Sequence, residues 1–374
     1  MKIIYLGSSP MPSRAANTIH VAKMVNAFIS LGHELKLVYP NIKKGKEFTK
    51  LSIAEFYNVI EFSSTSVPWF KFPGYKYLSS FFIGLWLLFQ KKDLIYSRNF
   101  YYALFASALG NKNIILELHK PAITSKGFLR GYIENFYNSD KLQAIVVISQ
   151  ALRNRFLLDG FSSEKIIVAH DGCDEINGVL KRDLGFGFHV GYIGHLYEGK
   201  GMEIIQQLAY CIKDDVHFHI VGGTKEDISF WEGKIISDNI TFHGFVPSKD
   251  VYGFISAMDI CLLPNQLKVK DSSGSSDIGD FTSPLKMFDY MALGKAIIAS
   301  DLAVLREVLD ENNSILCDPS NIDLWVEAIE KLKMNRELRE SLGSKAKEDF
   351  LTNFTWKKRA QYIIEQIENI RSND

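Results

Sequence analysis

Short apolar runs alternate with helix-length stretches along most of this chain. The run at Lys2–Leu6 is followed by an amphipathic stretch at Thr18–Leu31, which Gly32 ends, and by a second run at Glu34–Tyr39, which Pro40 ends. This β-α-β order is typical of parallel strands, because a crossover helix must return the chain to the starting edge of the sheet. The pattern therefore predicts an α/β fold with parallel sheets covered by helices.

The alternation is interrupted once and then resumes. A glycine-rich passage near Ile176–Phe188 predicts an interdomain linker, and the length of 374 residues also favours two domains. We therefore expect two Rossmann-like, doubly wound domains, at residues 1–180 and 181–354, facing a cleft. The further strands are expected at Leu94–Ser97, Ile114–Leu118, Ala144–Ile148, Lys165–Ala169, His189–Ile193, His217–Val221, Ile240–Phe242, Ile260–Leu263 and Ala296–Ala299.

The chain from Asn321 onward is predicted to be helical throughout. Its last stretch, Thr355 to Ile370, has a single apolar face at three-to-four spacing, and such a face needs a partner. We expect residues 355–374 to cross back and pack on the first domain. The residues of this face are Trp356, Ala360, Ile363, Ile364 and Ile367.

Charge is balanced over the whole chain but not between its halves. The 43 Lys and Arg equal the 43 Asp and Glu, which argues against a nucleic-acid-binding protein. Residues 1–175 carry 21 basic and 13 acidic side chains and residues 176–374 carry 22 and 30, so the halves have net charges of +8 and −8. This asymmetry predicts different tasks for the two halves.

Cysteine usage and the start of the chain predict a cytoplasmic protein. The four cysteines form no CxxC pair and no zinc spacing with histidine, which fits reduced thiols. Met1 leads directly into a strand, so no export signal is visible. The longest apolar stretch, Phe81–Phe89, is about half of the ~20 residues that a transmembrane helix needs.

The strongest local signal is the block TSPLKMFDYMALG. Ser283 as N-cap, Pro284 as first helical residue and Gly294 as stop predict a short helix that begins at a strand end. The free N–H groups of such a start bind phosphate, and Lys286 adds a positive charge. Asp289, one turn further on, can accept a hydrogen bond from a ribose hydroxyl. The alternative is a well-capped helix with a solvent-exposed Lys–Asp pair.

Glycines also follow three neighbouring strands of the second half. Gly194, His195 and Lys200 lie in the turn after the first of these strands, Gly222 follows the second, and the third leads into FHGFVP. Each alone is more often an ordinary strand-to-helix turn. Together they lie on the carboxyl edge, where open α/β sheets bind ligands. The nearby stretch Asn265–Phe281 is either a lid or a surface loop.

In this order, these motifs resemble the nucleotide-sugar domain of family 4 (group 1) glycosyltransferases of the GT-B fold, in the subgroup with Ser-Pro-Leu-Lys at the donor-site helix start. The resemblance rests on the Gly194 to Lys200 loop, IVGG, FHGFVP and SPLKMFDYMALGKAIIASD. The first half is similar to the acceptor domain of that family at Asn17–Val21, Glu117–His119, Val147–Ser149 and Asp171–Asp174. The resemblance covers nearly the whole chain.

The resemblance implies a donor site with two departures. The second acidic residue of the family's Glu-x7-Glu pattern, which holds the ribose, matches Asp289, but the first falls at Phe281. The Arg/Lys pair on the diphosphate matches His195 and Lys200, and a neutral imidazole contributes less there than a guanidinium. We expect donor binding by Gly194, His195, Gly222, Ser283, Pro284, Leu285 and Asp289.

His119 matches the family histidine that contacts the transferred sugar near the leaving phosphate, and a structural histidine is the alternative. The predicted catalytic residues are His119, Lys200 and Lys286, with Glu117 as a weaker candidate. Arg98 and Asn99 line the acceptor side or form a surface turn. The predicted acceptor-side residues are Ser13, Arg14, Asn17, His20, Arg98 and Asn99.

The activity implied by the resemblance is that of a retaining glycosyltransferase in cell-surface polysaccharide biosynthesis. It moves a sugar from a nucleoside diphosphate sugar to a glycan or polyprenyl-diphosphate-linked acceptor, while lysines stabilise the leaving diphosphate. No Asp-x-Asp metal pair is present in a convincing setting, so we expect no metal and no other cofactor. A sugar-nucleotide epimerase of the same architecture and a non-catalytic nucleotide- or glycan-binding subunit are the alternatives.

The basic first half also predicts peripheral association with an anionic membrane, at the inner face of the cell membrane. Lysines lie near two apolar stretches, Trp69–Phe72 and Phe81–Phe89. The alternative, which the pattern favours for Phe81–Phe89, is a buried helix before the next strand. The lysines are Lys43, Lys44, Lys46, Lys91 and Lys92.

Overall fold

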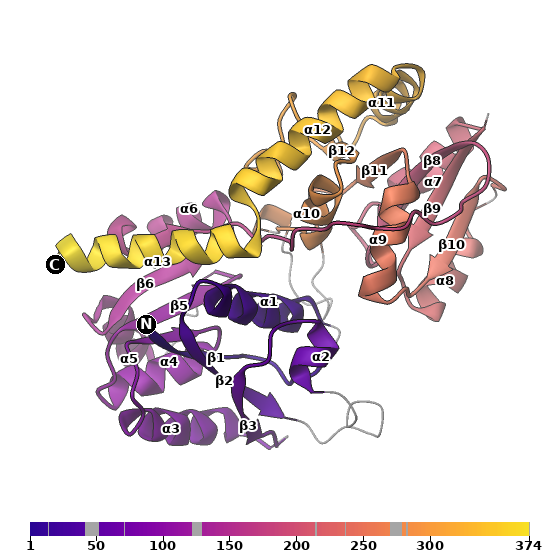
Figure 1. Ribbon diagram of the computed structural model, residues 1–374. Helices are drawn as coiled ribbons and strands as arrows, with labels where there is room; N and C mark the ends of the chain where they lie inside the picture. Colours follow the sequence, from indigo (N-terminus) through magenta and orange to yellow (C-terminus); the bar gives the residue numbers. More distant parts are fainter. Residues whose placement is uncertain are drawn as a thin grey trace. The chain divides into compact units, whose positions relative to one another are not determined.

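The computed structural model describes residues 1–13, 15–41, 52–70, 72–121, 129–213, 215–235, 237–269, 279–281 and 283–373. The chain forms two compact units, one made of Met1–Asp171 with Trp356–Asp374 and the other of Gly172–Thr355. Each unit is built on one parallel sheet (Figure 1). Among the described residues, no helix is both long enough and apolar enough to cross a bilayer.

The first unit contains seven parallel strands in the order β3-β2-β1-β4-β5-β6-β7. Its central strands are buried along nearly their whole length, as in a parallel sheet covered on both faces. The strands are β1 Lys2–Leu6, β2 Glu34–Asn41, β3 Ser63–Pro68, β4 Leu94–Ser97, β5 Ile114–Leu118, β6 Leu142–Val147 and β7 Ile166–Val168. The helices are α1 Ala16–Ser30, α2 Ile53–Tyr57, α3 Tyr75–Leu88, α4 Phe100–Ala108, α5 Leu129–Asn138, α6 Gln150–Leu158 and the 3-10 turn η2 Ser163–Lys165.

Two details at the edge of this sheet differ from the prediction. Strand β2 does not stop at Pro40 but continues to Asn41. The proline is tolerated because β1 ends earlier and requires no N–H from it. The carbonyl of Pro40 accepts a hydrogen bond from Met11 N at 3.2 Å. The edge strand β3 was not predicted. Its sequence SSTSVP lacks the apolar alternation of a strand, and pairing with β2 alone defines it.

The second unit contains six parallel strands in the order β10-β9-β8-β11-β12-β13. The strands are β8 Phe188–Ile193, β9 Val216–Val221, β10 Ile240–Gly244, β11 Ile260–Leu263, β12 Ala296–Ser300 and the unpredicted three-residue β13 Ile315–Cys317. The helices are α7 Met202–Cys211, α8 Lys225–Glu232, α9 Ser248–Ala257, the 3-10 turn η3 Gly279–Phe281, α10 Leu285–Ala292, α11 Ile322–Met334 and α12 Arg336–Asn353.

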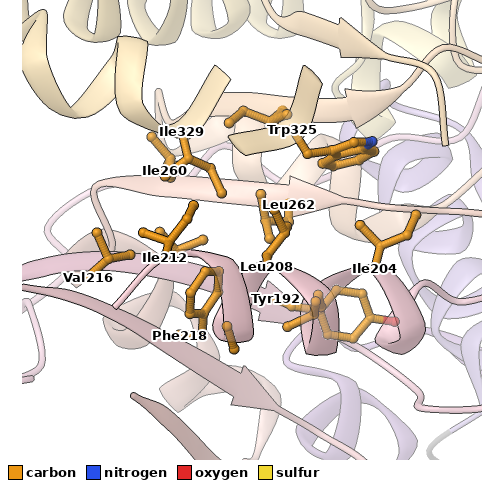
Figure 2. Close-up of a cluster of buried hydrophobic side chains, with 14 of the residues drawn as sticks. Tyr192, Ile204, Leu208, Ile212, Val216, Phe218, Ile260, Leu262, Trp325 and Ile329 are labelled. Carbon is orange, nitrogen blue, oxygen red and sulfur yellow. The ribbon is translucent and has the colours of Figure 1, made fainter. Parts of the chain in front are cut away.

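One face of this second sheet packs on α7 and α11 (Figure 2). Tyr192 and Phe218 from the strands face Leu208 of α7, and Trp325 of α11 is fully buried over the sheet. The indole of Trp325 donates a hydrogen bond to Asp318 O at 3.0 Å, so its polar atom is satisfied. This core holds the strand ends that carry the candidate site.

Helix α13, Trp356–Asn373, belongs to the first unit, as the amphipathic pattern predicts. It lies along α1 and contacts β6 (Figure 1). All five apolar residues of the predicted face are buried: Trp356, Ala360, Ile363, Ile364 and Ile367. The tail is not one uninterrupted helix, because Asn335 and Phe354 separate α11, α12 and α13.

The chain passes into the second unit at Gly172, before the linker expected near Ile176–Phe188. Close backbone packing is the reason. Cys173 N donates to Phe354 O at 3.1 Å, and Cys173 forms an isolated parallel β-bridge with Thr355. A Cβ on Gly172 would lie 2.5 Å from Phe354 O. The first and last residues of the second unit therefore pack against each other.

Candidate active site

Three strands of the second unit end in glycines that pack backbone to backbone. Gly194 N donates to Val221 O at 2.9 Å, and Gly222 N donates to Gly244 O at 2.8 Å. A Cβ on Gly222 would lie 2.2 Å from Gly194 O, and the φ angles of Gly194 and Gly222 are 143° and 125°. The glycine motifs that follow these strands thus lie together at the carboxyl edge of the sheet.

Lys200 lies between two glycines that contact the chain after β11. A Cβ on Gly199 would lie 2.1 Å from Lys268 O, and a Cβ on Gly201 would lie 2.0 Å from Pro264 O. Any other residue at these positions would push the two loops apart. The close packing holds the Lys200 backbone at the edge of the sheet, and burial lowers the pKa of its ammonium to about 8.

Helix α10 begins one residue later than predicted. Pro284 occupies the N-cap position with an extended backbone (ψ 114°), and Leu285 is the first helical residue. No described side chain caps the helix. The first turn forms when Met287 N donates to Pro284 O at 2.9 Å. Ser283 is therefore not the N-cap, and its buried Oγ has no hydrogen-bond partner among the described residues.

Lys286, in the first turn of α10, points into the second unit. Its Nζ lies 3.7 Å from the centroid of the Tyr192 ring, next to the position that a Cβ on Gly194 would take. This Nζ is buried and has no hydrogen-bond partner in the described part of the chain. Burial, and then the neighbouring Lys200, hold the pKa of Lys286 well below its usual range. The alternative of a solvent-exposed Lys–Asp pair is therefore wrong.

Asn265 is another buried polar residue without a hydrogen-bond partner in the described part of the chain, and it was not predicted as a site residue. It directly follows Pro264, is fully buried, and neither amide atom has a partner among the residues described. Native proteins rarely leave buried polar groups unpaired, and a ligand can supply the missing bonds. Its place just after a strand at the carboxyl edge was the one sequence signal that could have identified it.

Asp289 is held by a thiol. Cys173 Sγ donates to Asp289 Oδ1 at 3.0 Å, and Tyr252 Oη lies 3.9 Å from the same sulfur. Burial, and then the Asp289 charge, raise the pKa of Cys173 well above its usual range, so the thiol keeps its proton. The contact fixes the Asp289 carboxylate, which remains partly exposed. Nothing in the spacing of the two residues indicated this pair.

The remaining donor-side positions are His195, Phe281 and the predicted lid. The ring of His195 stacks on Tyr197 with the ring centroids 4.7 Å apart. Partial desolvation, and then the charge of Lys200, lower the pKa of His195. Phe281 ends the 3-10 turn η3, so no carboxylate stands at that position. Most of the predicted lid, residues 270–278, and Thr282 lie outside the described residues.

In the first unit, Glu117 is the centre of a buried polar cluster. Its carboxylate accepts hydrogen bonds from Tyr96 Oη at 2.5 Å, His119 Nε2 at 2.8 Å and Arg359 Nη2 at 2.8 Å. Burial alone would raise the pKa of Glu117, but Arg359, and then His20 and Arg98, outweigh it and hold the pKa well below its usual range. Glu117 is therefore an anion that is fully paired.

The cluster fixes the state of His119 at the end of β5. Burial, and then Arg98, lower the pKa of His119 to about 4, so its ring is neutral at physiological pH. Because Nε2 donates to a carboxylate, Nδ1 carries the lone pair. The His119 side chain is 21% exposed, whereas Glu117 is fully buried. The ring is thus held in one tautomer with an accessible edge.

His20 and Arg98, both predicted on the acceptor side, join the same cluster. Arg98 Nη1 donates to His20 Nδ1 at 2.7 Å, and His20 Nε2 lies 3.1 Å from Glu117 and 3.2 Å from Asp171. Burial raises and His119 lowers the pKa of Asp171, with a net value of about 2. His20, His119 and Asp171 bring three potential metal ligands within 4.8 Å, but the neighbouring guanidiniums of Arg98 and Arg359 disfavour a cation there.

Arg359 was not predicted, although it is among the most highly connected members of the cluster. It comes from α13 and donates to His170 O at 2.8 Å, to Ala169 O at 3.1 Å and to Glu117. The sequence signal was a lone arginine beside the buried position 360 of an amphipathic helix. Only docking of α13 on the first unit reveals its partners.

The remaining acceptor-side residues make local contacts. Ser13 Oγ lies 3.0 Å from Thr18 Oγ1, and Asn17 Nδ2 donates to Ser9 Oγ at 2.5 Å. Asn99 caps α4, because its side chain accepts hydrogen bonds from the first amides of the helix. Arg14 lies outside the described residues.

Known families match both units in chain order. Glycosyltransferase Family 4 matches residues 18–175, and Glycosyl transferases group 1 matches residues 187–335. The chain belongs to the family 4, group 1 glycosyltransferases. Spore coat protein SA of Bacillus subtilis (strain 168) is 28% identical over 196 residues, which are 48% of this chain and 48% of that protein. The match thus spans about half the length of this curated relative.

Solved glycosyltransferases share the fold of this family member. Anabaena HepE in complex with UDP and glucose has a TM-score of 0.72 at 16% identity, covering 99% of this chain and 100% of that one. A glycosyltransferase from Rickettsia africae ESF-5 has a TM-score of 0.74 at 13% identity over 100% and 99%. The lipopolysaccharide outer core galactosyltransferase WaaB has 0.70 at 15% identity over 99% of both chains. The fold is GT-B, as the motifs indicated.

Proposed function

We propose that this glycosyltransferase moves a sugar from a nucleoside diphosphate sugar to a glycan or lipid-linked glycan acceptor. The observation that carries the proposal is the buried Nζ of Lys286 at the start of α10, which has no hydrogen-bond partner among the residues that the structure describes. A buried ammonium without a counter-ion is costly, and an anion beside it would offset that cost. The Anabaena neighbour binds UDP and glucose, which supports a nucleotide-sugar donor.

The donor diphosphate, in this proposal, lies between Lys286 and Lys200. The first amides of α10, at Leu285 and Lys286, add hydrogen-bond donors with no partner in the helix, and Gly194 and Gly222 allow close approach of the backbone. Asp289, held by Cys173, accepts a hydrogen bond from the ribose. Asn265 and Ser283 supply further polar contacts to the donor.

Catalysis by these residues is electrostatic. When the bond between the anomeric carbon and the diphosphate oxygen breaks, negative charge grows on the diphosphate, and the two lysines stabilise it. These charges allow a metal-independent reaction, and membership of the family supports retention of the anomeric configuration. The neutral His119 ring contacts the transferred sugar through its exposed edge.

The acceptor is proposed to be a cell-surface glycan precursor on the cytoplasmic side of the membrane. The WaaB neighbour, a lipopolysaccharide outer core galactosyltransferase, supports a glycan acceptor. The described cysteines are unpaired, which fits a reducing compartment. His119, which His20 contacts edge to face in the polar cluster of the first unit, supplies the sugar-facing side chain.

A turnover screen tests the proposal. Purified protein is offered UDP-, GDP-, ADP- and dTDP-sugars with EDTA, with and without a pool of polyprenyl-diphosphate-linked sugars, and products are read by mass spectrometry. We expect acceptor-dependent release of one nucleotide, at least about 100-fold slower in Lys286→Ala and unchanged in Lys225→Ala, an exposed lysine of the same unit. Isomerisation without acceptor would instead identify an epimerase. Binding without turnover would identify a non-catalytic subunit.

A further inference from the structure

Helix α3 of the first unit is apolar on two faces. One face, with Ile83 and Leu87, is buried, and Gly84 lets the helix approach α4, since a Cβ there would lie 3.1 Å from Phe105 O. The opposite face is exposed, so the helix expected before β4 is present but is buried on one side only. Its residues recur at helical spacing and are 38–80% exposed: Leu78, Phe81, Phe82, Leu85, Leu88 and Phe89.

A pocket of about 350 Å³ opens between this helix and the edge of the sheet. Residues of β2 and β3 line one side of the pocket, and residues of α3 line the other. The volume lies within the range of roughly 300–1,000 Å³ of ligand sites. The lining is almost entirely apolar, with Val38, Val67, Phe70, Leu78, Phe82 and Trp86 as its main residues. Such a pocket fits a hydrocarbon chain and offers little to a polar ligand.

The charged residues of the segment that carries this face are all lysines. Residues 62–92 contain four lysines and no acidic residue. Lys76 lies at the start of α3 and the exposed Lys91 follows its end, while Lys36 Nζ lies 5.1 Å from the Trp86 ring. A second copy of the chain, paired through the same face, would bring lysines against lysines. The charge pattern therefore selects an anionic partner.

We propose that the exposed face of α3, together with β3, docks on an anionic lipid bilayer and that the pocket takes one acyl chain of that bilayer. Exposed apolar patches of this kind mark interaction sites, and aromatic side chains flanked by lysines suit the interface of an anionic membrane. The proposal goes beyond sugar transfer, because membrane binding is measured with no donor present.

Vesicle flotation tests the docking of the full chain. We expect it to float with vesicles of phosphatidylglycerol and phosphatidylcholine, to float weakly with phosphatidylcholine alone, and to be released by salt. The double variant Phe82→Ser with Phe89→Ser should bind at least about tenfold more weakly. The matched control is Phe186→Ser with Phe230→Ser, two exposed phenylalanines of the second unit, which should bind normally.

Two further experiments test separately the docking on anionic lipid and the binding of an acyl chain in the pocket. Lys91→Glu should weaken binding to anionic vesicles, whereas Lys357→Glu, an exposed lysine of α13, should not. Lipids with brominated acyl chains should quench the fluorescence of Trp86 in the pocket, and Trp86→Phe should remove most of that quenching. The tryptophans at 231, 325 and 356 are buried and serve as the internal reference.

Four results would contradict the proposal or a part of it. Equal flotation with neutral and anionic vesicles would remove the role of the lysines. If the folded protein does not float with any vesicles, the proposed membrane docking is wrong. A concentration-dependent dimer that the Phe82→Ser/Phe89→Ser variant abolishes would assign the face to a second copy. Flotation without quenching of Trp86 would show that no acyl chain enters the pocket and would contradict that part of the proposal.

Discussion

The two units each carry a buried polar centre, and the two centres differ in how completely their groups are paired. In the first unit, Glu117 accepts three hydrogen bonds and lies near two further side chains, the His20 ring and the Arg98 guanidinium. In the second, Lys286 Nζ and both amide atoms of Asn265 have no hydrogen-bond partner among the described residues. Both centres lie near the carboxyl ends of parallel strands.

This difference separates two physical tasks. A paired cluster holds one arrangement, because breaking any contact leaves a buried charge uncompensated. It suits the orientation of His119. Unpaired groups reduce the stability of the unliganded protein and leave that free energy available for binding an anion. Arg359→Leu in the first unit and Lys286→Met in the second should therefore change the stability in opposite directions.

The largest effect is expected for Arg359→Leu in the paired cluster. The change leaves the Glu117 charge without its main partner, and we expect the free energy of unfolding to fall by about 3–5 kcal/mol. Urea denaturation measures it. Lys357→Leu, on the same helix but exposed, is the control. Adding Glu117→Gln to Arg359→Leu should restore part of the loss, and a small effect of Arg359→Leu alone would show that the cluster does not hold α13 in place.

The change with the opposite sign is Lys286→Met in the unpaired centre. Removing a buried ammonium that has no partner within the described ranges should raise the free energy of unfolding by about 1–2 kcal/mol without nucleotide. The variant should also lose the thermal stabilisation that UDP or another nucleoside diphosphate gives to the parent protein. A destabilised variant that still responds to the nucleotide would contradict the comparison.

The pH dependence of donor binding tests Lys200. The pKa of its ammonium is about 8 without ligand, and a bound diphosphate favours the protonated form. Affinity should therefore be constant below pH 7 and fall by up to about tenfold per pH unit above pH 8. Isothermal titration of the nucleotide gives the profile, and Lys200→Arg should flatten it. A profile that stays level to pH 9.5 would exclude a proton on Lys200 from binding.

The smallest effect is expected at Cys173. Cys173→Val removes the donor that holds Asp289 Oδ1, at a cost of about 1 kcal/mol, so KM for the donor should rise a few-fold with little change in kcat. Cys173→Ser keeps a hydrogen-bond donor and should recover most of the affinity. Steady-state kinetics separates the two parameters. Equal KM values for the parent and both variants would show that Asp289 needs no help from the thiol.

Much of the fold could be predicted from the sequence because its signals are local. The strands Lys2–Leu6, Leu94–Ser97, Ile114–Leu118 and Ile260–Leu263 have the predicted bounds, since continuous apolar runs define buried parallel strands. β3 could not be predicted, because a Ser- and Thr-rich segment becomes a strand only when β2 offers it an edge. The start of α10 was misplaced by one residue, because Ser283 and Pro284 satisfy two cap registers equally well.

The sequence by itself determined the family, the two parallel sheets and the positions of Lys200, Lys286 and Asp289 relative to strand ends. Only the tertiary structure decided which polar groups are paired. Arg359 reaches Glu117 from more than two hundred positions away, and Cys173 reaches Asp289 from another element. The same holds for α3, whose two apolar faces are alike in sequence, although one is buried and the other exposed. Periodicity depends on the chain alone, whereas pairing and burial depend on which distant segments pack together.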